Sequence, residues 1–158
     1  MGRIEIIYQK GLQMSFQESI ATVFKKYFIF NGRASRSEYW WFYLFLFLMG
    51  VVFTILSNIA SSYEVVDLIF NLGVLIPSIS VAVRRLHDIN KSGWYVLIPL
   101  IPLPFFLLLT FIHKIEYVAM IEIILGLGLI ALSIYLIYLL AKTGDKGPNK
   151  YGEPVISE

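Results

Sequence analysis

The stretch that decides the fold is residues 39–60, which read YWWFYLFLFLMGVVFTILSNIA without any Asp, Glu, Lys or Arg. A helix needs about 20 predominantly apolar residues to cross a hydrocarbon core of roughly 30 Å. A surface helix of a soluble protein shows a polar face, and this stretch has none. It therefore predicts a transmembrane helix.

Three further apolar stretches follow, at residues 65–83, 94–112 and 119–140. Their only charged residues are Asp67 and Glu122, each near one end of its stretch. None of the stretches alternates polar and apolar residues as the strands of a β-barrel do. The sequence therefore predicts an all-α integral membrane bundle of four transmembrane helices.

Composition supports a membrane protein. Apolar residues make up 58% of the chain and charged residues 15%, against roughly 25% charged in soluble proteins. The chain has no cysteine, which excludes disulfides and thiolate metal sites, and its net charge of +2 gives no indication of nucleic-acid binding. We expect neither a cofactor nor a bound metal.

The basic residues predict the orientation. Of the 13 Lys and Arg residues, only Lys114 lies outside the segments that precede the first span, join the second to the third and follow the fourth. The positive-inside rule places those segments in the cytoplasm. We expect a multi-pass protein with both termini on that side.

An amphipathic helix is predicted before the first span, over residues 15–30. Ser15 and Glu18 have the spacing of a capping box. An apolar stripe follows at helical intervals: Phe16, Ile20, Val23, Phe24, Tyr27 and Phe28. The helix suits an interfacial anchor better than a partner-binding helix. The expected organisation is an extension at 1–14, a four-span domain with its leading helix at 15–143, and a cytoplasmic tail at 144–158.

Polar residues gather in three segments that the topology places at one membrane face, residues 31–41, 84–94 and 144–154. Because they share a face, they can meet. Two hypotheses fit the charged residues: an ion-pair clasp, or a site for anionic lipid headgroups, whose phosphate oxygens suit the guanidinium fork. The candidate residues are Arg33, Arg36, Glu38, Arg84, Arg85, His87 and Asp88.

The three segments also carry a resemblance. They contain Gly-Arg-Ala-x-Arg-x-Glu-Tyr-Trp, Arg-Arg-Leu-His-Asp-x-x-Lys-Ser-Gly-Trp and Gly-x-Asn-x-Tyr-Gly, in that order. Over roughly residues 28–154 the chain resembles the bacterial membrane family called domain of unknown function 805. It departs from the usual pattern at residues 101–104 (Ile-Pro-Leu-Pro) and 144–148 (Gly-Asp-Lys-Gly-Pro). The resemblance implies a bacterial inner-membrane protein and supplies no activity.

The remaining polar residues give little support to catalysis or transport. His87 beside Asp88 lacks further ligands for a metal and has no nucleophile beside it, so we expect no enzyme. An oligomeric transporter or channel component is the alternative, with a pore lined by Ser57, Asn58, Asn71, Ser78 and Ser80. Transporter sites usually place charged residues at midplane, and none is found here. Pro99, Pro102 and Pro104 must kink or break the third stretch.

The sequence favours a non-catalytic small integral membrane protein that self-associates or docks a partner. Its expected partners are membrane lipids and either its own copies or another membrane protein.

Overall fold

The computed structural model describes residues 14–60, 62–111 and 118–155. Its elements are α2 (Phe16–Lys25), α3 (Arg36–Ser57), α4 (Ser62–Asp88), the 3-10 helix η1 (Gly93–Leu100), α5 (Leu103–Phe111) and α6 (Val118–Ala141). Every regular element in these ranges is a helix, so the all-α prediction is confirmed. The extension predicted at residues 1–14 lies almost entirely outside the described residues.

Four apolar segments correspond to the four predicted stretches. The helices α3, α4 and α6 are each long and apolar enough to cross a membrane, and a shorter apolar segment covers Gly93–Leu108. The 22 residues of α3 extend about 33 Å at roughly 1.5 Å per residue, which matches the hydrocarbon thickness. These segments are those of a membrane helical protein.

The third apolar segment is broken into η1 and α5. Pro99 lies inside η1, Pro102 lies in the break, and Pro104 lies in the first turn of α5, where a missing N–H costs no helical hydrogen bond. At about 2.0 Å per residue in a 3-10 helix and 1.5 Å in an α-helix, the two pieces together extend roughly 30 Å. The prolines therefore divide the third apolar segment into two short helical pieces.

The leading helix α2 starts as predicted and ends early. Ser15 and Glu18 form both hydrogen bonds of the capping box. The Ser15 backbone N–H and, to a lesser extent, the Ser15 hydroxyl donate to the Glu18 carboxylate and lower the pKa of this group. The predicted end at residue 30 was wrong, because α2 stops at Lys25. The Ser80 hydroxyl of α4 donates to the carbonyls of Lys26 (3.1 Å) and Ile29 (2.6 Å), a tertiary contact that competes with helix continuation.

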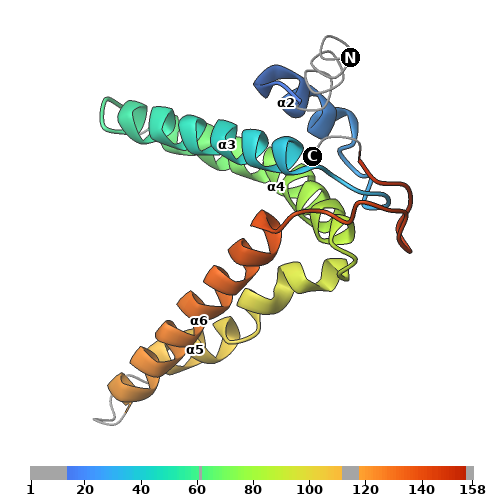
Figure 1. The fold of residues 1–158 in the computed structure, drawn as a ribbon. Helices are drawn as coiled ribbons and strands as arrows, with labels where there is room; N and C mark the ends of the chain where they lie inside the picture. The colour runs from blue at the N-terminus through green and yellow to red at the C-terminus, as the bar shows by residue number, and fades with distance from the viewer. Residues whose placement is uncertain (1–13, 61, 112–117, 156–158) are drawn as a thin grey trace.

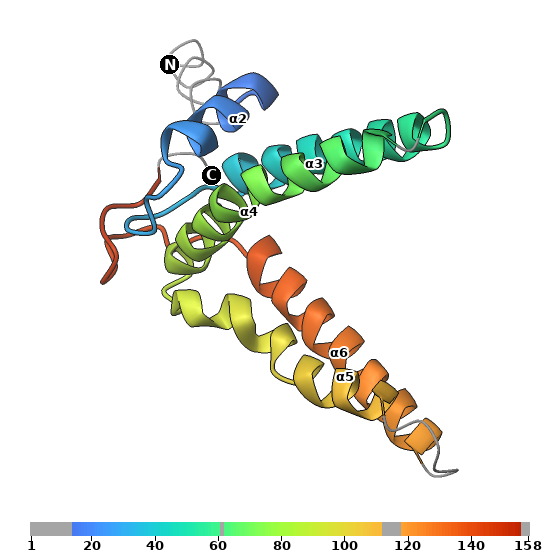
Figure 2. The ribbon, with the colours of Figure 1, turned by 180° about the vertical axis from the view of Figure 1, so that it is seen from behind.

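The elements form two helical hairpins that meet at one end and diverge from there (Figures 1 and 2). One hairpin is α3 with α4, the other is η1 and α5 with α6, and α2 and the C-terminal tail (residues 142–155) lie at the junction. Most of the buried core is also near the junction, formed by side chains such as Phe42, Val81, Leu86, Leu139 and Leu140. Away from the junction the hairpins expose their apolar side chains.

Candidate functional site

The C-terminal end of α4 is the centre of the junction. Asn90 adopts a left-handed conformation (φ 56°), and the N–H groups of Asn90 and Lys91 donate to the carbonyls of His87 (3.0 Å) and Leu86 (2.9 Å). This pattern is a Schellman motif, in which a residue at positive φ ends the helix. The chain turns away at Asn90, and the last carbonyls of α4 are left to face the connector between α2 and α3 and the tail.

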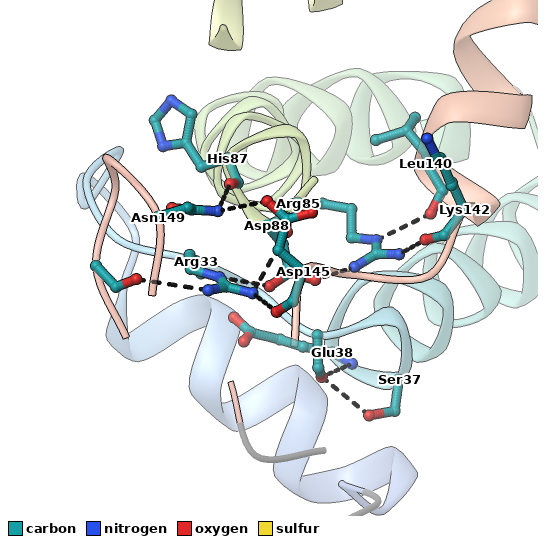
Figure 3. Close-up of polar contacts among 12 residues, drawn as sticks. Arg33, Ser37, Glu38, Arg85, His87, Asp88, Leu140, Lys142, Asp145 and Asn149 are labelled. Carbon is teal, nitrogen blue, oxygen red and sulfur yellow. Dashed lines mark hydrogen bonds and ion pairs between the residues drawn. The ribbon is translucent and has the colours of Figure 1, made fainter. Parts of the chain in front are cut away.

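Arg33, in that connector, binds this helix end. Its Nε donates to Asp88 Oδ1 (2.7 Å), and its Nη2 donates to the Asp88 carbonyl (3.4 Å). The same guanidinium reaches the tail, donating to the carbonyls of Gly147 (2.8 Å) and Asp145. A cation at a helix C-terminus is favourable because the helix dipole is negative there. Arg33 thus links the α2–α3 connector, α4 and the tail (Figure 3).

Arg85 joins α4 to the end of α6. Its Nη1 donates to Asp88 Oδ2, its Nε to the Leu140 carbonyl (2.9 Å) and its Nη2 to the Lys142 carbonyl. The two oxygens of the Asp88 carboxylate therefore accept from two different guanidinium groups, those of Arg33 and Arg85. Since these side chains are at most 4% exposed, one buried carboxylate is shared by two buried cations, and backbone carbonyls accept their remaining hydrogen bonds.

A second buried ion pair joins α4 to α3. Arg84 Nη1 donates to Glu38 Oε1 at 2.5 Å, and both side chains are at most 2% exposed. The Arg84 Nε and Nη2 have no acceptor among the described residues. Glu38 lies in the first turn of α3, where its N–H donates to the capping Ser35 hydroxyl (3.1 Å). We call Arg33, Glu38, Arg84, Arg85 and Asp88 the junction cluster.

The tail is fastened to the same helix end. The Asp145 N–H donates to the Asp88 carbonyl (2.9 Å), and Asn149 Nδ2 donates to the His87 carbonyl (3.0 Å). The His87 ring points away from the arginines (Figure 3). It stacks on Tyr151 with 3.7 Å between ring centroids, and its Nδ1 lies 3.1 Å from the Gly32 carbonyl oxygen. The tail therefore contacts both sides of the α4 terminus.

Residues 27–153 match the model of a protein family described as protein of unknown function (DUF805). The chain belongs to this family. Two Escherichia coli K12 relatives are called inner membrane protein YhaH (39% identical over 85 residues) and inner membrane protein YhaI (33% over 82). Each similarity covers 51% of this chain and 70% of the relative. No solved structure matches the chain significantly.

These comparisons place the DUF805 protein among bacterial inner-membrane proteins. The family model covers all the residues of the junction cluster and most of the tail that binds it. Neither the family description nor the names of the relatives state an activity.

The structure brings together five of the seven candidate residues, namely the junction cluster. Arg36 is exposed in the first turn of α3, and His87 faces the other side of α4. Sequence reasoning did not assign roles to Asp145, Asn149 and Tyr151, which bind α4 from the tail. The third motif, Gly-x-Asn-x-Tyr-Gly, could have indicated two of them, because its Asn and Tyr are Asn149 and Tyr151.

The residues considered for a pore bond to the chain's own backbone. Ser80 is fully buried and bridges to the connector after α2, as described above. The other four donate within their own helix or at its end, with acceptors three or four residues earlier: Ser57, Asn58, Asn71 and Ser78. Ser80 is therefore not available to line a channel. Within the described ranges, no cluster of three or more His, Cys, Asp or Glu residues could hold a metal ion.

Proposed function

We propose that this DUF805 protein is a non-catalytic, multi-pass inner-membrane protein that acts by associating with its own copies through its membrane helices. The observation that carries this proposal is the divergence of the two hairpins (Figures 1 and 2). In the most apolar windows of α3 and α6, only 11% of the residues are buried. Lipid or other helices must therefore cover most of both hairpins.

In this proposal the junction cluster is a structural clasp that holds the two hairpins and the tail together. Of the two hypotheses for these residues, the observed contacts favour the clasp over a headgroup site. All three nitrogens of Arg33 and of Arg85 donate to groups of the protein itself. An anionic headgroup would have to displace these contacts in order to bind.

The clasp would lie on the cytoplasmic side of the membrane, with both termini. The asymmetry of the basic residues supports the cytoplasmic side. The common location of α2 and the tail at the junction supports placing both termini on the same side (Figure 1). We expect alkaline phosphatase, which is active only in the periplasm, to be inactive when fused after Glu158. The same reporter inserted at Ser62, the first residue of α4, should be active. Phosphatase activity from the C-terminal fusion would contradict the orientation.

Self-association is testable by cysteine crosslinking, because the chain contains no cysteine. Single cysteines at exposed positions along α6, from Met120 to Tyr138, should form disulfide-linked dimers when native membranes are oxidised. A helix interface contains residues three or four apart, so dimers should recur with that period. We expect the yield at the peak positions to be several-fold higher than at the positions between them. Dimers are read out on non-reducing gels.

The control is a cysteine at Leu139, on the same helix but only 4% exposed at the junction core. It should give no dimer. Co-expression of copies carrying two different tags distinguishes self-association from docking to another protein, because only the former gives a product with both tags. Monomer at every α6 position, and in the same scan of the exposed positions of α3, would overturn the proposal. A product with one tag and a foreign mass would replace it by partner docking.

A further inference from the structure

A cavity of about 430 Å³ lies on the His87 side of α4, separate from the arginine contacts. Its walls come from α4, from η1, from the connector after α2 and from the tail. The size is within the roughly 300–1,000 Å³ of small-molecule sites. None of the junction-cluster residues lines it. The cavity is therefore a feature that the clasp does not explain.

The cavity changes in polarity along its length. Ile79, Val83 and His87 line it at four-residue spacing on one face of α4, a run of about 12 Å along the helix axis. Val96 and Leu97 of η1 form the wall around the apolar part. The apolar part lies toward the membrane-spanning portion of α4, and the polar part lies at the helix end.

Polar groups surround the His87 end. The His87 ring is stacked on Tyr151, and its Nδ1 contacts the Gly32 carbonyl beside Asn31, which also lines the cavity. Lys150 Nζ lies 4.9 Å from the centre of the Tyr151 ring, and no Asp or Glu is among the lining residues that the structure describes. This end of the cavity, which we call its mouth, therefore combines hydrogen-bonding groups with the positive charge of a neighbouring lysine.

We propose that this cavity binds one membrane phospholipid, with an acyl chain between α4 and η1 and the phosphate at the mouth near His87 and Lys150. The apolar-to-polar gradient matches the order of chain, glycerol and phosphate in such a lipid. The exposed side chains at the rim support a lipid as the occupant, since Trp94 is 76% exposed and Phe30 39%. Tryptophan is favoured at the membrane–water interface, where these groups of a lipid lie. The site does not depend on self-association, because all its walls come from one chain.

The test uses vesicles of phosphatidylethanolamine and phosphatidylglycerol that contain phosphatidylglycerol with a photoactivatable diazirine in one acyl chain. After irradiation, mass spectrometry of the full-length protein's peptides should find label at Ile79–Val83 and at Val96–Leu97. Ile79→Trp narrows the apolar part of the cavity and should reduce this labelling several-fold, because the larger indole occupies part of the space between α4 and η1 that a chain would need. Labelling of the exposed α6 residues Leu127 and Ile134 is the internal reference and should be unchanged.

The matched control is Leu75→Trp, one turn earlier on α4 at a position that is 52% exposed and does not line the cavity. It should keep the labelling of the wild type. Leu97→Trp, from the opposite wall, gives a second variant in case Ile79→Trp does not fold, with Leu100→Trp as its control. Equal loss in variants and controls, or no loss in either filling variant, would overturn the proposal. A diazirine fatty acid without phosphate should label the cavity several-fold less, and equal labelling would overturn the role of the headgroup.

Discussion

Replacing Asp88 by alanine should lower the free energy of unfolding by about 3–5 kcal/mol, the range for breaking a buried ion pair from one side. Asp88 is 3% exposed, and its carboxylate accepts from both Arg33 and Arg85. The substitution leaves two buried guanidinium groups without that anion. We expect a large decrease of the melting temperature in detergent, measured by intrinsic tryptophan fluorescence.

The control for this prediction is Glu153→Ala, which removes a carboxylate from an exposed position in the tail. Surface substitutions of this kind usually change stability by less than about 0.5 kcal/mol. A melting temperature of Asp88→Ala that equals the control's would show that the Asp88 ion pairs contribute nothing to stability. Limited proteolysis gives a second measurement, since the loosened tail of Asp88→Ala should be cleaved faster than that of the control.

The membrane helices could be predicted from the sequence because their signal is local. A run such as residues 39–60 requires a helix in lipid whatever surrounds it, since the bilayer cannot hydrogen-bond the backbone. The end of α2 and the internal structure of the third segment were harder to predict. The residues that follow α2 bind Ser80, which lies on another helix, and a contact of this kind cannot be read from the local sequence. The prolines predict that the third segment is either kinked or broken, and the sequence left open which of the two occurs.

For the junction cluster, the sequence predicted the shared location of the residues but not the ion pairs that they form. The topology predicted that the three polar segments share one face, and in the structure they make contact. Which arginine meets which carboxylate could not be predicted. Arg84 and Arg85 are neighbours on α4 and point about 100° apart around the helix, given 3.6 residues per turn. The rotation of α4 in its packing therefore decides that Arg84 meets Glu38 and Arg85 meets Asp88.

The structure gives one glycine of the tail a steric role that the sequence did not predict. A Cβ placed on Gly144 would lie 2.0 Å from Asp88 Oδ2 and 2.8 Å from its Cγ. A flexible side chain could move aside, but Asp88 is short and held by Arg33 and Arg85. The tail can therefore approach the end of α4 this closely only with glycine at position 144.

Gly144→Ala is accordingly expected to destabilise the protein by about 3 kcal/mol, at the upper end for overpacking, because either the tail or the Asp88 carboxylate must move. Gly147→Ala is the matched control, since a Cβ there meets nothing within 4 Å. It should melt within a few degrees of the wild type.

The double variant Gly144→Ala with Asp88→Ala tests whether the clash with Asp88 causes the loss of stability. If the clash with Asp88 is responsible, the alanine at position 144 should cost much less once the carboxylate is gone, a coupling measurable by a double-mutant cycle. Strictly additive losses would mean that Gly144 is required for some other reason than its contact with Asp88.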